Sequence, residues 1–469
     1  MTDSVSLSLV REARATTFDD LPGEVVQQAK NLILNALGSG MMGHLVEPGQ
    51  IVERAAMQSL GQPESTIWGS GLRTSFLWAA MSNVAKVANT GHWDKCYYTP
   101  EGTVPLGANR GLIPALLTAA QKERATAKDA ITAIVVGYET ANKIMDALGG
   151  MSALKVRKWS PDTVARPCAL AIAAARLFTL SEEQTVNALG IAGCFGQAPR
   201  VVTSATAKHH LRSPVLAFNA LLAVTLARAG YPGPTDVLDG DDGLNEVLFS
   251  GTIDLEKLRQ PRNAWSILYT GVNRTSVDGD VVGPVEAALE LVIEHDLRPE
   301  DVESVVVRTN PYQVKYQGDR TNPELLAPPT REVAVHSMFY ATAAAILYRS
   351  IGFDEFLEER FLALDPRLTD LIERISAVPE PKYANLNQSG SAEIVTRDGR
   401  RFTREVLHPK GLHPMNQMTA GEHEDNFRDM AGRVIPGTQV EEIVHLVREL
   451  EAVEDLERLI EKLVVLGGD

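Results

Sequence analysis

The chain has 469 residues, and length scaling predicts about two to three domains rather than one small core. Hydrophobic residues make up 44% of it and charged residues 22%, which is typical of a globular protein and not of a disordered, collagen-like or membrane chain. The net charge of −15 argues against nucleic acid and anionic membranes as partners. A small anionic substrate remains compatible with this charge, because a local pocket of cations can outweigh the field of the whole chain.

The cysteines predict a reducing environment. Cys96, Cys168 and Cys194 are odd in number and widely spaced, so they offer neither a disulfide framework nor a CxxC motif. Residues 1–22 carry several charges, which leaves no apolar core for a signal peptide, and no later run reaches the length of a membrane span. We therefore expect a cytoplasmic protein with no membrane partner.

The first half of the chain reads as nearly all helical. Ala-rich stretches at 169–176 and 217–229 have small side chains on many faces, which predicts closely packed, buried helices. Gly230, followed by the Pro-rich segment 231–234, predicts the end of the second of these helices.

After about residue 265 the pattern changes to mixed α and β. Residues 302–308 are β-branched and short, which predicts a strand. In 392–404, Asp398 and Gly399 lie between two strand-like runs and predict a hairpin.

Helical spacing returns between and after these strands. We expect a helix over 331–349 and another over 354–376, interrupted at Pro366. Near the C-terminus, an apolar stripe from Ile443 to Leu463 predicts a helix that packs back onto the first half.

These patterns predict a mainly α protein with two domains. A large all-helical domain is formed by both chain ends, 1–265 and 411–469, and a smaller α+β domain, 266–410, is inserted between them.

Two loop regions carry candidate catalytic groups. In 89–107, His92, Asp94 and Lys95 lie among aromatic and turn-forming residues, where catalytic groups are common. The alternative for Asp94 is that it caps a helix or pairs with Lys95.

The segment 200–214 offers Lys208, His210 and Arg212 just before an Ala-rich helix, and a helix N-terminus with such cations suits a carboxylate or phosphate. The alternative is that these cations only solvate a loop. His336 to Tyr340 lie on an apolar helix, where such side chains are more often satisfied core groups than catalysts.

Known cofactor motifs are missing from the sequence. There is no HExxH, GxSxG, Walker or dinucleotide-binding motif in a suitable context, and the cysteines cannot ligate an iron–sulfur centre. We therefore expect no metal and no cofactor, and acid–base chemistry by side chains alone.

Several sequence features occur in an order, along nearly the whole chain, that resembles the MmgE/PrpD family. This family includes 2-methylcitrate dehydratase and cis-aconitate decarboxylase. No single feature is diagnostic, but their order is fairly specific. They are Asn83, the Asp94 region, Gly137-Tyr138-Glu139, Leu180-Ser181, Lys208, Gly230-Tyr231-Pro232, His336 to Tyr340, and Asn426-Phe427.

The resemblance implies a homodimer whose α+β domain acts as a lid, with the active site in the cleft between the domains. Asp94 or His92 would be the base, Lys208 would stabilise an enolate-like charge, and Tyr340 would donate a proton or orient the substrate. The residues expected to hold substrate carboxylates are Arg157, Lys158, His210, Arg212 and Arg274.

The chain also departs from the family pattern. Thr99-Pro100 stands where the family has His-Pro, Trp159 replaces a histidine, and Ile267 replaces the lysine of the lid. These changes predict a divergent substrate or reaction.

Three hypotheses follow for the function. The first is a cofactor-independent lyase, of dehydratase or decarboxylase type, acting on a small di- or tricarboxylic acid or a related analogue. The second is an isomerase or epimerase using the same cleft. The third is a family member that has lost catalysis, since the fold alone does not decide the function.

Overall fold

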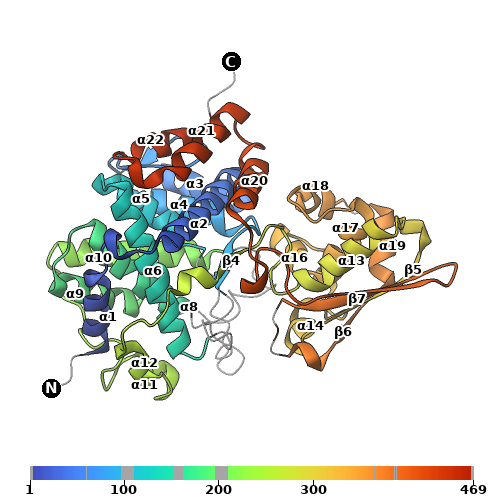
Figure 1. Cartoon of the computed structure of the whole chain (residues 1–469), viewed down its shortest axis with the longest axis horizontal. Coiled ribbons are helices and arrows are strands. Elements are labelled where there is room, and N and C mark those ends of the chain that lie inside the picture. The colour runs from blue at the N-terminus through green and yellow to red at the C-terminus, as the bar shows by residue number, and fades with distance from the viewer. Residues whose placement is uncertain are drawn as a thin grey trace. The chain divides into compact units, whose positions relative to one another are not determined.

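The computed structural model describes residues 4–59, 61–96, 110–150, 162–195, 210–363, 365–384, 386 and 388–465. Contacts between residues divide the chain into two compact units (Figure 1). The described residues of unit 1 lie within 1–200, 210–272 and 418–469. Those of unit 2 lie within 273–417. The chain is mainly α, as predicted, and both of its ends belong to unit 1.

Unit 1 consists of helices that pack directly on one another, with short two-stranded pairings between them. Its helices are α1 (Val5–Ala15), α2 (Gly23–Met42), α3 (Glu47–Gln58), α4 (Phe76–Ala88), α5 (Leu112–Glu123), α6 (Ala127–Ala147), α8 (Asp162–Leu177), α9 (Glu182–Cys194), α10 (Arg212–Arg228), α11 (Leu244–Phe249), α12 (Leu255–Arg259), α20 (Ala420–Ala431), α21 (Gly437–Arg448) and α22 (Glu457–Ile460). Its strands are β1 (Ser65–Thr66), β2 (Arg73–Thr74), β3 (Asp94–Cys96) and β4 (Thr270–Val272).

The Ala-rich sequence explains the close packing at the centre of unit 1. Helix α8 packs against α6, α9 and α10, and its alanines between 169 and 175 are buried. Small side chains let the helix axes approach closely. Helix α10 ends at Arg228, and Gly230 follows with a φ of 92°, as the sequence predicted.

The C-terminal stripe packs into unit 1 as expected, but the predicted continuous helix is wrong. Helix α21 ends at Arg448, and α22 begins only at Glu457. Asp455 accepts a hydrogen bond from the backbone N–H of Glu457, which favours a new helix start at this point. Val453 and Leu456, in the interruption, remain buried and keep the apolar stripe continuous.

Unit 2 combines a four-stranded sheet with helices. Its helices are α13 (Val282–Glu294), α14 (Pro311–Gln317), α15 (Pro323–Leu326), α16 (Arg331–His336), α17 (Met338–Tyr348), α18 (Glu358–Phe361) and α19 (Pro366–Arg374). Its strands are β5 (Val302–Thr309), β6 (Ile375–Pro379), β7 (Gly390–Thr396) and β8 (Arg401–Val406), in the order β6-β5-β7-β8.

The predicted strand and hairpin of unit 2 are confirmed. Strand β5 lies parallel to β6 and antiparallel to β7, and β7 and β8 form the hairpin around Asp398 and Gly399. Gly399 has a φ of 84°, which the turn requires and a β-carbon would resist. Helix α13 packs on β7 and β8 and against α17.

Two helix predictions in unit 2 need correction. The helix expected over 331–349 is split at Ser337, whose hydroxyl accepts a hydrogen bond from the backbone N–H of Tyr340 and so caps α17. Pro366 begins α19 instead of interrupting a helix, because the first helical position needs no N–H donor. Asp365 caps that helix by accepting from the backbone N–H of Arg367 at 2.8 Å.

A buried ion pair ties α4 to α3 in unit 1. The Lys86 ammonium lies 2.6 Å from the Glu53 carboxylate and donates to the Trp68 carbonyl at 2.5 Å. Burial lowers the pKa of Lys86, while Glu53 opposes this shift.

Replacing Lys86 by Met should destabilise the protein by about 3 kcal/mol, because Glu53 and the Trp68 carbonyl would be left buried without their cation. The shift of the urea unfolding midpoint measures this loss. The matched control is Lys122→Met, which removes a partly exposed ion pair with Glu64 and should cost no more than about 1 kcal/mol. Equal midpoints for the two variants would contradict the assignment.

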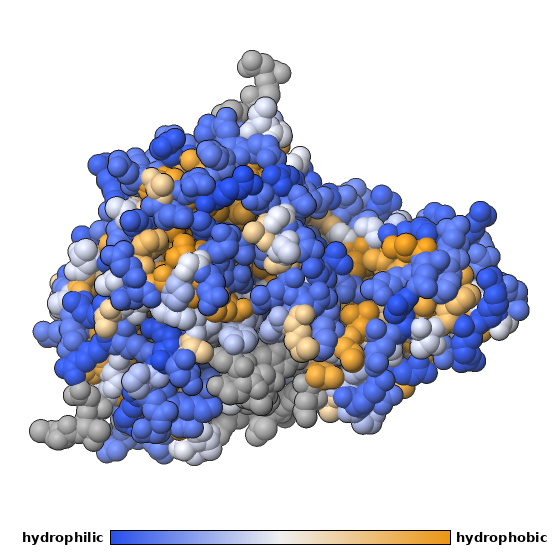
Figure 2. Space-filling model, viewed as in Figure 1, coloured by the Kyte–Doolittle hydropathy of each residue, from blue (hydrophilic) through white to orange (hydrophobic). Residues whose placement is uncertain are grey.

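On the face drawn in Figure 2, hydrophilic residues cover most of the surface, and smaller apolar areas lie among these residues. Among the described helices, none combines the length and apolar character needed to cross a membrane.

Candidate active site

A buried carboxylate at the start of strand β3 forms the centre of the candidate site. Strand β3 pairs with β4, so that Asp94 lies opposite Val272. The Asp94 carboxylate accepts a hydrogen bond of 2.8 Å from the hydroxyl of Tyr138 on α6. The alternative of a helix cap or an ion pair with Lys95 does not describe this arrangement, since Asp94 lies in a strand and bonds to a tyrosine.

Burial raises the pKa of Asp94, and this effect outweighs the opposing hydrogen bond from Tyr138 and the charges of Arg110 and Arg166. A carboxyl group with a raised pKa can exchange protons near neutral pH more readily than an exposed aspartate. This environment is typical of an acid–base catalyst.

Two buried arginines act electrostatically on Asp94. Arg110 precedes α5 and is 7% exposed, and Arg166 on α8 is 4% exposed. The Arg110 guanidinium lies 3.8 Å above the ring of Trp93, and Arg166 donates to the hydroxyl of Ser213 at 3.1 Å. Guanidinium groups fixed in this way are suited to hold a carboxylate.

His210 is held in place from several directions. Its backbone N–H donates to the side chain of Asn89 at 3.0 Å, and its ring meets the ring of Trp93 edge-on. Its Nε2 lies 3.1 Å from Nη1 of Arg110. Because a guanidinium can only donate, we assign Nε2 as the acceptor, which makes the imidazole neutral and places its proton on Nδ1.

Other predicted residues of unit 1 have different surroundings. His92 is buried, and its carbonyl accepts hydrogen bonds from Asn35 and Ser39 on α2. Arg212 is the first residue of α10. Arg157, Lys158 and Lys208 lie outside the described residues, so their places stay predictions.

Tyr340 and Arg274 belong to unit 2. The phenol of Tyr340 is buried and donates to the carbonyl of Glu355 at 2.7 Å, and burial raises the pKa of this phenol. The Arg274 side chain is about half exposed and lies 3.3 Å from the carboxylate of Glu286. Burial raises the pKa of Glu286 to about 7, with Arg274 opposing the shift.

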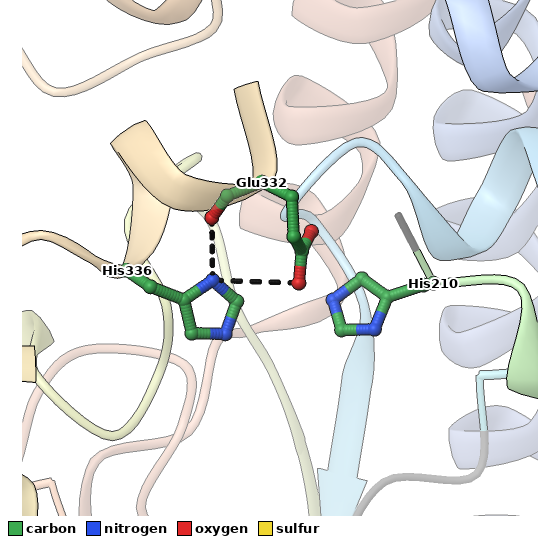
Figure 3. A group of neighbouring side chains, drawn as sticks. All are labelled: His210, Glu332 and His336. Carbon is green, nitrogen blue, oxygen red and sulfur yellow. Dashed lines mark hydrogen bonds and ion pairs between the residues drawn. The ribbon is translucent and has the colours of Figure 1, made fainter. Parts of the chain in front are cut away.

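His336 also belongs to unit 2, and buried acids surround its ring. Its Nδ1 lies 2.7 Å from the carbonyl oxygen and 3.4 Å from the carboxylate of Glu332, one turn earlier on α16. Dashed lines mark both contacts in Figure 3. Its Nε2 lies 3.4 Å from the carboxylate of Asp278. His210, the third residue labelled there, is part of unit 1.

Sequence reasoning missed three of the residues gathered around Asp94. Tyr138 was noticed only as part of a resemblance, and Arg110 and Arg166 were not singled out. Arg166 had a usable signal, because it is a lone charge in an otherwise apolar and Ala-rich stretch. Arg110 had no comparable signal.

Cis-aconitate decarboxylases are among the proteins similar to this chain. The cis-aconitate decarboxylase-like protein oryM of Aspergillus oryzae is 25% identical, over 96% of this chain and 94% of its own length. The cis-aconitate decarboxylases of Aspergillus terreus and Homo sapiens are each 24% identical, over 95% and 97% of this chain and 93% of their own lengths.

The contacts of Asp94 predict how the acid limb of the pH profile of kcat/KM shifts when Tyr138 is replaced. In Tyr138→Phe the ionised carboxylate loses a hydrogen bond that lowers its pKa, so the pKa rises further. If Asp94 acts as a base, the acid limb of kcat/KM should move to higher pH. Tyr231→Phe, at an exposed tyrosine, is the matched control, and superimposable limbs for the two variants would contradict the role of Tyr138.

The MmgE/PrpD N-terminal domain model matches residues 8–256, and the MmgE/PrpD C-terminal domain model matches residues 281–452. Since the two matches cover most of both units, this chain belongs to the MmgE/PrpD family.

Proposed function

We propose that this protein is a lyase, of dehydratase or decarboxylase type, that acts on a small di- or tricarboxylic acid or a related analogue. The observation that carries the proposal is the buried Asp94 carboxyl, with its raised pKa, under the electrostatic influence of two buried arginines. The names of the similar proteins support the reaction class, and the arginines support an anionic substrate.

In the dehydration route, Asp94 takes the proton from the carbon next to a substrate carboxylate. The electron pair of that C–H bond forms the new double bond, the β-hydroxyl takes the proton from Asp94 and leaves as water, and Asp94 is again ionised. In the decarboxylation route, the bond to one carboxylate breaks, carbon dioxide leaves, and protonated Asp94 returns a proton to the carbon. The raised pKa of Asp94 favours its protonated form more than in an exposed aspartate, which supports a role in proton transfer.

Arg110 and Arg166 are the proposed anchors for the substrate carboxylates, and neutral His210 adds a hydrogen bond. Charge that builds on the carbon next to a carboxylate is stabilised by fixed cations in a site that excludes water. Lys208 is proposed to share this electrostatic role. Tyr340 remains a proposed site residue from the family resemblance, and the others remain proposals from the sequence: His92, Arg157, Lys158, Arg212 and Arg274.

The same resemblance supports further proposals. Unit 2 is proposed to serve as the lid, the protein to act as a homodimer in the cytoplasm, and the reaction to need no cofactor. A lid would exclude water and strengthen the charge interactions during the reaction.

Product analysis tests the proposed function. We would incubate the protein with cis-aconitate, 2-methylcitrate and a panel of small hydroxy- and unsaturated di- and tricarboxylates in D2O, and follow the reaction by proton NMR. A lyase yields an alkene with water or carbon dioxide. An isomerase releases neither water nor carbon dioxide, and its product keeps every atom of the substrate except for one hydrogen exchanged for deuterium. That result would overturn the lyase assignment. No turnover across the panel would favour a protein that has lost catalysis.

On a substrate found in this way, Arg166→Met should raise KM by about 10- to 100-fold, because a charge-assisted hydrogen bond to a carboxylate is lost. Arg166→Lys should recover part of this loss, since it keeps the charge but not the fork of donors. Arg228→Met, at a half-exposed arginine that pairs with Glu123, is the control. A KM unchanged in Arg166→Met would remove this residue from substrate binding.

A further inference from the structure

Unit 1 contains a cavity of about 420 Å³ that does not include Asp94. Its lining comes from α1, α6 and α12, which pack together, and from the segment 260–266. Its volume lies within the range of small-molecule sites in proteins. None of its lining residues belongs to the site proposed above, so its purpose is unassigned.

The charges around this cavity balance. Its lining includes three carboxyl groups, from Glu12, Glu139 and Asp146, and three cations, from Lys143, Lys257 and Arg262, so the charges balance when Glu139 is ionised. Burial raises the pKa of Glu139, and the charge of Arg262 opposes this shift. Transferring a ligand with a net charge into such a neutral environment would leave that charge uncompensated and unfavourable. The balance therefore favours a ligand that is neutral overall.

The order of the charges on α6 indicates what kind of neutral ligand fits. Glu139, Lys143 and Asp146 are four and then three residues apart, so they share one face of the helix with alternating sign, about one helical turn from each other. A molecule with an ammonium at one end and a carboxylate at the other can place each charge beside an opposite one. An uncharged molecule would not make use of this alternation.

The charged groups are already held in position by the fold. The Lys143 ammonium lies 2.5 Å from Glu12 and donates to the carbonyl of Gln260, and the Lys257 ammonium lies 3.0 Å from Asp146. Arg262 stacks on the ring of Trp265 at 4.1 Å. Such preorganised groups lose little entropy when a ligand binds.

We propose that this cavity is a second binding site, and that it takes a small zwitterion, an amino carboxylate whose two charges are separated by a few carbon atoms.

The walls of this cavity continue directly to the residues that hold Asp94. The Glu139 carboxylate accepts hydrogen bonds from the backbone N–H groups of Ser266 at 3.0 Å and Ile267 at 2.9 Å, just before β4, which pairs with β3. Its neighbour Tyr138 donates to Asp94. Occupancy of the cavity therefore acts on the position and proton affinity of Asp94, and this second part of the inference rests on the proposed function.

Binding is tested without any assay of activity. The probe is γ-aminobutyrate, and butyrate and butylamine, which each lack one of its charges, are the matched controls. We expect γ-aminobutyrate to raise the melting temperature and to change the tryptophan fluorescence with one saturable affinity, because a ligand of the native state stabilises it. An equal effect of butyrate or butylamine, or no saturable effect of γ-aminobutyrate, would overturn the zwitterion site.

Variants locate the site. Asp146→Asn and Lys143→Met should each weaken γ-aminobutyrate binding by about tenfold. Asp146 is partly exposed, so its variant remains a valid test if Lys143→Met folds poorly. Lys128→Met, on the same helix but outside the lining, should bind as the parent does. Trp265→Phe should lose the fluorescence change and keep the thermal shift. Unaltered affinity in Asp146→Asn would place the probe elsewhere.

The link to Asp94 has its own readout. On a substrate found by product analysis, saturating γ-aminobutyrate should shift the acid limb of kcat/KM, and it should lose this effect in Asp146→Asn. An unchanged profile would overturn the link while binding stands. Absence of any substrate would count against the proposed function alone, because the binding measurements do not depend on it.

Discussion

Asp94→Asn should lower kcat about 10³-fold on the substrate that the protein turns over, because the amide can neither take nor return the proton. The replacement has the same shape, and its side-chain oxygen can still accept the hydrogen bond from Tyr138. KM should change little, since the proposed carboxylate anchors are Arg110 and Arg166. Steady-state kinetics of the purified variant give both constants.

This loss should occur without unfolding. The pKa of Asp94 is raised in the folded state, which means that the folded protein binds this proton more tightly than the unfolded chain does. The protonated carboxyl therefore stabilises the fold at low pH, and this contribution is lost as the pH rises through the folded pKa. An uncharged Asn removes the unfavourable ionised form, so the melting temperature at neutral pH should not fall. Asp242→Asn, the same exchange at an exposed residue, is the control. A kcat within tenfold of the parent would exclude Asp94 as the base or acid.

Arg331→Met should destabilise unit 2 by about 3–5 kcal/mol. The Arg331 guanidinium is buried, donates to the carbonyl of Phe356 at 2.5 Å and donates to the hydroxyl of Ser276 at 2.9 Å. It also stacks on the ring of Phe353 at 4.3 Å. Met preserves much of the packing volume but leaves these acceptors, and the charge of neighbouring Glu332, without their cation.

Hydrogen–deuterium exchange is the suitable measurement, because the described part of unit 2 contains no tryptophan. Peptides covering 331–356 should exchange faster in Arg331→Met, and the fluorescence of unit 1 should not change at the same denaturant concentration. Arg400→Met removes an exposed ion pair with Asp398 in the same unit and should exchange as the parent does. If both variants behave alike, Arg331 does not stabilise unit 2.

The positions of two helix boundaries show where local pattern reading fails. Apolar spacing over 331–349 is continuous, yet the chain breaks at Ser337 because its hydroxyl also donates to the carbonyl of Leu325. That contact comes from a separate helix, α15, and cannot be deduced from the spacing around Ser337. Pro366 was interpreted as an interruption, although the same residue type is equally suited to begin a helix.

Local patterns in the sequence were sufficient to determine the mainly helical composition, the strand β5, the hairpin at Asp398 and Gly399, and the end of α10 near Gly230. Each of these depends on residues that are neighbours along the chain, whose conformational preferences act over a few positions. The sequence also singled out Asp94 and, through the order of its motifs, the family.

Only the tertiary structure decided which groups surround Asp94. Arg110, Tyr138 and Arg166 come from three separate segments, and their effect on the Asp94 carboxyl depends on distance and burial rather than on sequence spacing. The same holds for the charged cavity at α6, whose opposing cations and carboxylates are contributed by segments more than 100 residues apart. The packing of helices brings such side chains together, and the conformational preferences of neighbouring residues do not predict which side chains will meet.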